Sequence, residues 1–249
     1  MRASAIEFRL RMAIMAVIIS VGAWSPWIDA TGSARRISLL EWLPLELSRT
    51  GLASFTFATP LVIVLASLIA ALGATLRVWG AAYLGPSTVN SMGMKAGAVM
   101  ADGPFRYVRN PLYLGSACMV AAITFILPPS GALFVVVLLA VFLLRLILAE
   151  EAFLTRQLGE PYQAYMRAVP RLIPRVRTIL PATGTGLKPH WLLAVLSELT
   201  AIGVFITLAF LSWRYDNQLM TQAILISFGA SLVVRALMPR ASSTTTAAE

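Results

Sequence analysis

Six apolar runs, each close to the length that a lipid bilayer requires, constrain the fold more than any other feature of the sequence. They cover residues 12–27, 59–82, 113–127, 133–148, 191–213 and 219–238. A helix needs about 20 predominantly apolar residues to cross the hydrocarbon core, where every backbone polar group must be bonded internally. The runs therefore predict an all-α, polytopic membrane protein with about six transmembrane helices.

The composition agrees with a membrane protein rather than a soluble domain. Hydrophobic residues make up 58% of the chain and charged residues only 12%, whereas about a quarter of a soluble domain is charged. The net charge of +9 suits cytoplasmic loops rich in Lys and Arg, so we expect no nucleic-acid partner.

Orientation follows from the distribution of the cations. With the N-terminus inside, four of the 20 Lys and Arg residues lie outside, namely Arg35, Arg36, Arg49 and Arg214. Cytoplasmic loops carry the excess of Lys and Arg in membrane proteins. We therefore expect a multi-pass protein with both termini cytoplasmic, in a bacterial cell membrane.

The first apolar run has two interpretations. Its basic start, with Arg2, Arg9 and Arg11, is also found in secretory signal peptides. However, Trp24 and Trp27 occupy the region where a small-x-small cleavage site would lie, and tryptophans suit a membrane interface. We therefore favour a retained anchor.

The sequence divides into four parts. Residues 1–100 hold the N-terminal spans and loops, residues 101–180 a central core, residues 181–240 the C-terminal spans, and residues 241–249 a low-complexity tail expected to be disordered. In the core, Pro128-Pro129-Ser130-Gly131 predicts a tight turn between the third and fourth runs. This helical hairpin brings two polar inner segments, 85–110 and 149–189, to one membrane face, where we expect the site.

The first motif is Asp102-Gly-Pro-Phe-Arg-Tyr-Val-Arg-Asn-Pro-Leu-Tyr-Leu-Gly115. Pro111 restricts Asn110 to extended geometry and suits the first position of a helix, with Asn110 as its N-cap. Free N–H groups at a helix start bind anions, and Arg109 adds a bidentate donor for carboxylate or phosphate. The alternative is a capped interfacial helix whose arginines contact lipid headgroups.

The second motif runs from Glu150-Glu151 to Tyr165 and is followed by Val169-Pro-Arg-Leu-Ile-Pro174. Adjacent helical residues point about 100° apart, so we expect one glutamate to face a site and the other a cation. Gly159-Glu160-Pro161 is typical of a helix end followed by a new helix, which would place Tyr162 and Tyr165 on one face. The alternative is an amphipathic interfacial helix.

Together the two motifs resemble the isoprenylcysteine carboxyl methyltransferases and the related membrane phospholipid methyltransferases. Members of this group carry Gly-Pro-Tyr/Phe followed by Arg-His-Pro-x-Tyr-x-Gly, then a hairpin, a Glu-Glu pair and Val-Pro-Arg-x-Ile-Pro. The match covers about residues 102–174 in order and spacing. Two positions depart from the pattern: Asn110 stands where His is commonest, and Leu158 where Phe is usual.

The resemblance implies that S-adenosylmethionine is the cofactor and that it binds between the first motif and the glutamate pair. The implied catalytic residues are Arg109, Glu150 and Arg171. The implied cofactor-binding residues are Gly103, Tyr107, Arg109, Asn110, Pro111, Tyr113, Leu114, Gly115, Glu150 and Glu151. No metal site is expected, because the chain has one cysteine, Cys118, and one histidine, His190.

Methyl transfer from a sulfonium requires positioning and desolvation more than acid–base groups. We expect a lipophilic or prenylated acceptor that enters from the bilayer, with carboxylate O-methylation favoured and Arg171 or Arg167 orienting the carboxylate. Two alternatives are a sterol-type membrane reductase that binds NADPH and a non-catalytic membrane protein. The sequence gives no indication of oligomeric state.

Glu198 is an acid within the fifth apolar run. Charges inside a membrane usually pair with one another, so we favour an interhelical ion pair with Arg77 or Arg235. The alternative is a carboxylate that lines a tunnel for the acceptor.

Overall fold

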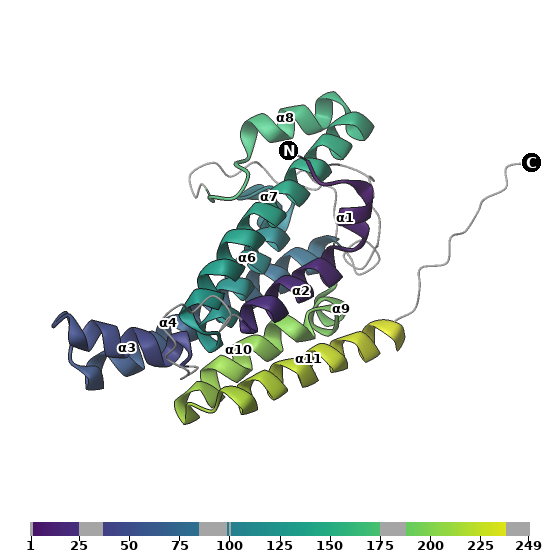
Figure 1. The fold of residues 1–249 in the computed structure, drawn as a ribbon. Helices are drawn as coiled ribbons and strands as arrows, with labels where there is room; N and C mark the ends of the chain where they lie inside the picture. Colours follow the sequence, from purple (N-terminus) through teal and green to yellow (C-terminus); the bar gives the residue numbers. More distant parts are fainter. Residues whose placement is uncertain (1, 25–36, 85–98, 100, 175–187, 238–249) are drawn as a thin grey trace, which may run out of the picture.

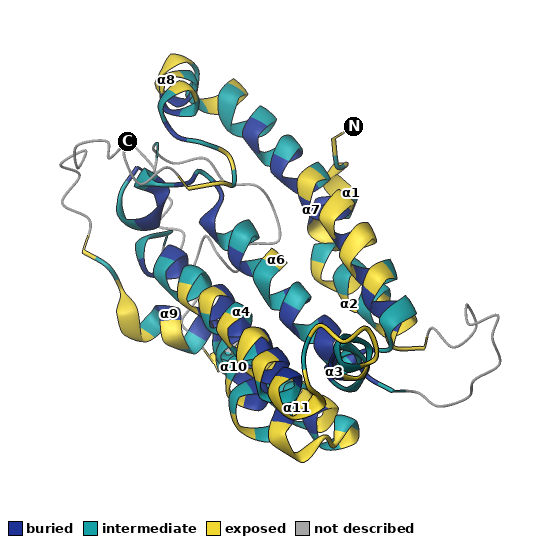
Figure 2. Ribbon diagram, turned by 90° about the vertical axis from the view of Figure 1, so that its left-hand side faces the viewer, coloured by how far each residue is buried: buried dark blue, intermediate teal, exposed yellow. Residues whose placement is uncertain are grey.

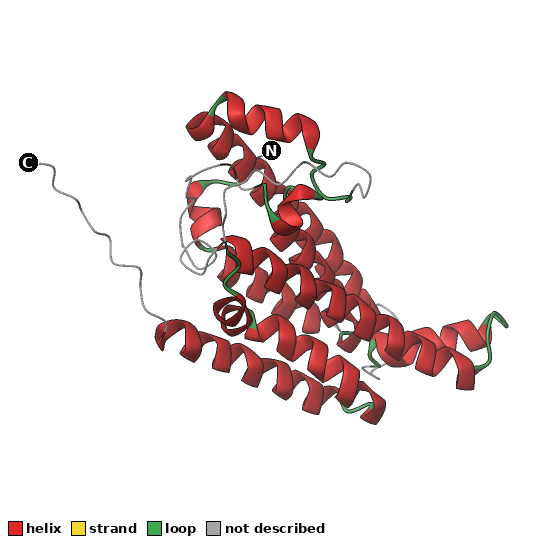
Figure 3. Cartoon of the chain, turned by 180° about the vertical axis from the view of Figure 1, so that it is seen from behind, coloured by secondary structure: helices red, strands yellow, loops and turns green. Residues whose placement is uncertain are grey.

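The computed structural model describes residues 2–24, 37–84, 99, 101–174 and 188–237. Within these residues every regular element is a helix (Figures 1 and 3), which confirms the all-α class. The α-helices are α1 (Ala5–Arg9), α2 (Arg11–Ala23), α3 (Leu39–Arg49), α4 (Phe55–Leu84), α6 (Pro111–Ile123), α7 (Pro129–Leu158), α8 (Glu160–Ala168), α9 (Trp191–Ser197), α10 (Leu199–Leu211) and α11 (Asn217–Leu237). Short 3₁₀ turns are η2 (Gly103–Arg106), η3 (Thr124–Ile126) and η4 (Ser212–Arg214).

Helix α4 is central and packs against α6, α10 and α3. Its inner face carries Ala66, Ala70 and Ala74 at four-residue spacing, and all three are buried. Small residues at this spacing let neighbouring helices approach closely. The alanine stripe therefore has the packing role that the sequence indicates.

The predicted helical hairpin is formed by α6 and α7, but its turn is shorter than expected. Helix α7 begins at Pro129, so Ser130 and Gly131 lie in its first turn. Proline suits the first positions of a helix because its missing N–H would have no partner there. Helix α2 packs along α7, and α7 continues through the glutamate pair to Leu158.

Three described helices are long and apolar enough to cross a membrane: α4, α7 and the part of α11 from Asn217 to Val234. A fourth span results if α9 and the helix after it are counted together. The helices in the first and third predicted runs, Arg11–Ala23 and Pro111–Ile126, are apolar but shorter. The structure therefore supports three or four of the six predicted spans by length and composition.

Exposed positions, yellow in Figure 2, occur along α4 and α7, and many of them carry large apolar residues, as expected for contact with lipid. Leu61, Leu65 and Leu68 on α4, and Leu133 and Val141 on α7, are exposed. A soluble protein rarely leaves apolar patches of this extent uncovered, whereas acyl chains solvate them at no cost. This arrangement fits an integral membrane protein.

The fifth predicted span is not a straight helix. Helices α9 and α10 meet at Glu198 and are bent by 69°. Glu198 is buried at this bend and pairs with Arg77 of α4, with Nε to Oε2 at 2.6 Å and Nη2 to Oε1 at 3.0 Å. The expected ion pair is confirmed with Arg77, while the Arg235 side chain lies outside the described part of the structure.

Helix α3 has no counterpart among the elements that the sequence analysis assigns. A capping box starts it: the Ser38 backbone N–H donates to Glu41, and the Glu41 side chain also accepts from the Ser38 hydroxyl. Leu39 N–H donates to the Leu127 carbonyl oxygen at 2.8 Å, which places α3 beside the α6–α7 turn. Figure 1 shows α3 at the opposite end of the molecule from α8.

Several sequence predictions fall outside the described residues. They concern the tail at 241–249, the position of Trp27, and the parts of the two polar segments at 85–98 and 175–187.

Candidate functional site

The Glu151 carboxylate joins the two sequence motifs. Its Oε1 accepts from Arg109 Nε at 3.0 Å and from Asn110 Nδ2 at 3.1 Å. Its Oε2 accepts from Arg171 Nε at 3.0 Å and lies 2.8 Å from Arg171 Nη2. Three segments, the loop before α6, the end of α7 and the chain after α8, are therefore held by one buried carboxylate. We call these four residues the Glu151 clamp.

Arg109 donates hydrogen bonds to several other groups of the protein. Besides Glu151, its Nη1 donates to the carbonyl oxygens of Met166 at 2.6 Å and Val169 at 2.9 Å. Its backbone N–H donates to the Pro170 carbonyl oxygen at 2.9 Å. The end of α8 leaves carbonyls without helical partners, and a guanidinium satisfies them well. Arg109 thus orders the loop after α8 rather than presenting its charge to solvent.

Asn110 differs from the prediction in its geometry. It precedes Pro111 at the start of α6, as expected, but its ψ of 57° is not extended. Among the described residues its side chain caps no backbone N–H of α6, since Nδ2 donates to Glu151 and to the Arg171 carbonyl oxygen at 3.3 Å. The charged carboxylate is a strong acceptor for Nδ2, so the amide is oriented toward Glu151 and its oxygen accepts from no N–H at the start of α6.

Glu150 has a different environment from Glu151, as the helical geometry predicts. The Tyr113 hydroxyl donates to Glu150 Oε2 at 2.7 Å and so links α6 to α7. Arg11 at the start of α2 contributes a favourable charge interaction with Glu150. Glu150 is partly accessible where Glu151 is buried, so Glu150 is the glutamate that can meet a ligand.

Helix α8 covers the Glu151 clamp from one side. Gly159 separates α7 from α8 with a φ of 62°, a conformation that a side chain would oppose. Tyr162 and Tyr165 are buried on one face, as predicted, and the Tyr165 hydroxyl donates to the Phe105 carbonyl oxygen at 2.7 Å. Burial raises the pKa of both tyrosines above their usual range. The Tyr165 hydrogen bond anchors η2 beneath α8.

Three residues of the first motif contact α4 instead of the Glu151 clamp. A Cβ added at Gly103 would lie 2.4 Å from the Tyr83 ring, and one at Gly115 would lie 2.6 Å from Arg77 Cγ. Pro111 Cγ is 3.7 Å from the position of a Cβ on Gly80. Gly103, Pro111 and Gly115 therefore permit close packing of α6 and η2 on α4.

The remaining predicted residues have mixed positions. Tyr107 contacts Trp79 of α4 with ring centroids 6.1 Å apart. Leu114 lies in the first turn of α6, where its N–H donates to the Asn110 carbonyl oxygen. Arg167 is exposed and pairs with Glu160 on α8. It is not part of the Glu151 clamp.

Three hydrogen-bond partners have no clear sequence signal: two carbonyls in the site and one hydroxyl between α6 and α4. The carbonyl oxygens of Met166 and Val169 receive Arg109, and any residue type supplies a carbonyl. Ser116 accepts a hydrogen bond from Arg77 Nη1 at 2.6 Å, on the side of α6 that faces α4. The sequence hints at this contact only through the position of Ser116, which follows Gly115 on a helix that packs against an arginine-bearing span.

The sequence was compared with known protein families, curated proteins and solved structures. Residues 61–161 match the phospholipid methyltransferase family. This region of the chain belongs to that family. It includes most of α4, both helices of the hairpin and the glutamate pair. No curated protein and no solved structure matches the chain.

The match confirms the resemblance seen in the motifs and indicates a membrane methyltransferase. It lends no support to the NADPH-dependent reductase alternative. The bonds that Arg109 and Asn110 donate to Glu151 lie within the matched range, whereas Arg171 and the loop that Arg109 binds lie beyond it.

Proposed function

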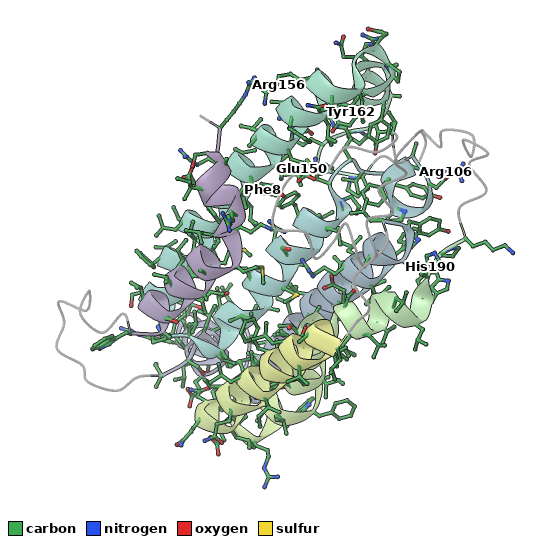
Figure 4. All side chains as sticks on the ribbon, turned by 90° about the vertical axis from the view of Figure 1, so that its right-hand side faces the viewer. Phe8, Arg106, Glu150, Arg156, Tyr162 and His190 are labelled. Carbon is green, nitrogen blue, oxygen red and sulfur yellow. The ribbon has the colours of Figure 1, made fainter. Side chains whose placement is uncertain are left out.

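We propose that the chain transfers a methyl group from S-adenosylmethionine to a lipid-like or prenylcysteine-type acceptor that enters from the bilayer, and that the acceptor group is a carboxylate. The observation that carries this proposal is the Glu151 clamp. It joins the two motifs of a methyltransferase family at one end of the α6–α7 hairpin. Figure 4 shows Glu150 and Tyr162 at this end, together with Arg156.

The side chains near the Glu151 clamp fit the chemistry of that cofactor. The Glu150 carboxylate and the Tyr113 hydroxyl can hydrogen-bond an ammonium group or ribose hydroxyls. The Arg171 side chain is 43% exposed even though it pairs with Glu151, so it retains donors for a carboxylate. Arg109 is 9% exposed and saturated on two of its nitrogens, which favours a positioning role.

When bound, the cofactor supplies an electrophilic methyl group on a sulfonium sulfur. A carboxylate acceptor needs no proton removed, so the protein's contribution is orientation and exclusion of water. In this proposal Arg171 orients the acceptor carboxylate, Glu150 and Tyr113 hold the cofactor, and Arg109 and Asn110 keep Glu151 and the loop after α8 in place. These assignments replace the predicted catalytic role of Arg109.

The finer topology belongs to the same proposal. We infer that all six apolar runs cross the membrane, with α2 and α6 shortened but packed against the longer α7 and α4. The Glu151 clamp then faces the cytoplasm, where the cofactor is made, and both termini are cytoplasmic as well. The excess of cations at that side supports this orientation.

The test uses cofactor with a labelled methyl group, purified protein and two acceptor sets: membrane lipid extracts and prenylcysteine analogues. We expect label in the organic phase with wild-type protein and a loss of about 10–100-fold in Glu150→Gln, the range for a hydrogen bond to a charged group. Glu160→Gln is the matched control, since Glu160 is exposed on α8. Absence of transfer to any acceptor by folded, cofactor-binding protein would refute the acceptor assignment.

A further inference from the structure

A cleft of about 470 Å³ lies between the N-terminal segment and the end of α7. Its floor is apolar and includes Phe8, Ala149, Ala152 and Phe153, while Arg2 and Arg156 line it as well. This volume lies within the usual range for small-molecule sites, about 300–1,000 Å³. Figure 4 shows the labelled Phe8 on the N-terminal helices and Arg156 near the end of α7.

The N-terminal wall of the cleft is anchored to α7. The Ala3 N–H donates to the Arg145 carbonyl oxygen at 3.1 Å, and Arg145 Nη2 donates to both carboxylate oxygens of Glu7 at 2.7 and 2.9 Å. A capping box between Ser4 and Glu7 starts α1. The cleft is therefore built by contacts between two separate segments rather than by a loose terminus.

The cleft lies at the membrane boundary. Helix α7 has 30 residues, so it is about 45 Å long at about 1.5 Å per residue and exceeds a hydrocarbon core of about 30 Å. Its charged residues begin at Arg145 and continue to Arg156. The apolar floor at Ala149, Ala152 and Phe153 is thus level with the region where lipid headgroups meet acyl chains.

The charges at the cleft are unbalanced. Arg2 and Arg156 are exposed, and among the described residues neither has an acidic partner, whereas Arg145 is paired with Glu7. Two unpaired guanidiniums beside an apolar floor are complementary to a phosphate that carries acyl chains. A zwitterionic lipid would bring its own cation to this position and so fit less well.

We propose that this cleft binds an anionic phospholipid, with the phosphate between Arg2 and Arg156 and an acyl chain against Phe8 and Phe153. The site is distinct from the Glu151 clamp. Ala149, Ala152, Phe153 and Arg156 recur at helical spacing on one face of α7, and Glu151 projects from the other side. The lipid would hold the N-terminal helices against α7, and the proposal stands whether or not the chain transfers methyl groups.

Native mass spectrometry of the detergent-solubilised full chain tests the proposal, with phosphatidylglycerol and phosphatidylcholine of equal chain length as probes. We expect phosphatidylglycerol to be retained and phosphatidylcholine to be retained at least tenfold less. In the double variant Arg2→Gln, Arg156→Gln, retention of phosphatidylglycerol should fall at least tenfold. Both arginines are exposed, so the fold should tolerate the change. Arg167→Gln removes one exposed charge on α8 and should leave retention unchanged.

A second variant tests the cleft itself. Ala152→Phe fills the floor without altering charge and should lower phosphatidylglycerol retention to the level of the double variant. Equal retention of the two lipids, or unchanged retention in either the arginine or the Ala152 variant, would overturn the proposal. Displacement of the lipid by millimolar inorganic phosphate alone would also overturn it, because the site would then recognise the ion and not the lipid.

Discussion

Arg109 and Glu151, 42 residues apart in the sequence, form an ion pair with Nε 3.0 Å from Oε1, and both side chains are less than 10% exposed. The pair lies where the loop before α6, the end of α7 and the chain after α8 converge. Because Arg171 and Asn110 bond the same carboxylate, removal of Glu151 would leave two cations and an amide without the carboxylate that they share. The stability of the site therefore depends on Glu151 more than on Glu150.

Glu151→Gln should destabilise the protein much more than Glu150→Gln. Removing one partner of a buried ion pair costs about 3–5 kcal/mol, whereas Glu150→Gln mainly weakens one hydrogen bond from Tyr113, worth about 1.5–3 kcal/mol. Thermal melting in detergent, monitored by circular dichroism, measures the loss of stability in each variant. Equal melting temperatures for the two variants would show that the Glu151 clamp does not hold the three segments together.

The Arg77–Glu198 pair should behave as a structural unit. We expect Glu198→Gln to cost about 3–5 kcal/mol because Arg77 is left without its carboxylate at the bend between α9 and α10. The double variant Arg77→Gln, Glu198→Gln should recover part of this loss, and the coupling energy follows from a double-mutant cycle of melting data. A Glu198→Gln protein that melts normally but has lost methyl transfer would instead assign Glu198 to the acceptor path.

Substitutions at two helical glycines should have opposite effects. Gly115→Ala places a Cβ 2.6 Å from Arg77 Cγ and should destabilise by about 1–3 kcal/mol, as overpacking does. In Gly229→Ala on α11 the added Cβ has no neighbour within 4 Å. This change should be neutral or stabilising, since alanine is more favourable than glycine in a helix by about 1 kcal/mol. Comparing the two melting temperatures removes the shared effect of the glycine-to-alanine change, and a destabilised Gly229→Ala would contradict the packing argument.

The buried tyrosines of α8 should make stability fall at high pH. The pKa of Tyr165 is raised in the folded state by burial, so its contribution is complete below the unfolded pKa of about 10 and is lost as the pH rises above it. Melting temperatures at pH 8 and above pH 10 measure this loss. Tyr165→Phe should reduce the difference between the two values. The same pH dependence in wild type and variant would rule out Tyr165 as a source.

The sequence predicts the parts of this structure that depend on local pattern. Apolar runs locate α4, α7 and α11, Gly159 separates α7 from α8, and Pro111 begins α6. The 100° step between Glu150 and Glu151 correctly gives them different partners. The alanine stripe at Ala66 correctly indicates packing.

Predictions that depend on tertiary contacts are less successful. The Asn110 side chain does not cap α6 because its Nδ2 donates to the Glu151 carboxylate, a contact that no local pattern shows. The resemblance places Gly115 among the cofactor-binding residues, but the atoms closest to it are those of Arg77 and Gly73 on α4. The bend at Glu198 also escapes the apolar pattern, because the run continues without a Pro or Gly at that point.

The most direct test of a cofactor site beside the Glu151 clamp is calorimetric titration of the folded, detergent-solubilised protein with S-adenosylmethionine, its demethylated product and NADPH. We expect micromolar binding of the first two ligands and none of NADPH, with affinity lowered about tenfold or more in Glu150→Gln and unchanged in Glu160→Gln. Absence of heat with either methyl-transfer ligand, from protein shown by its melt to be folded, would contradict the account.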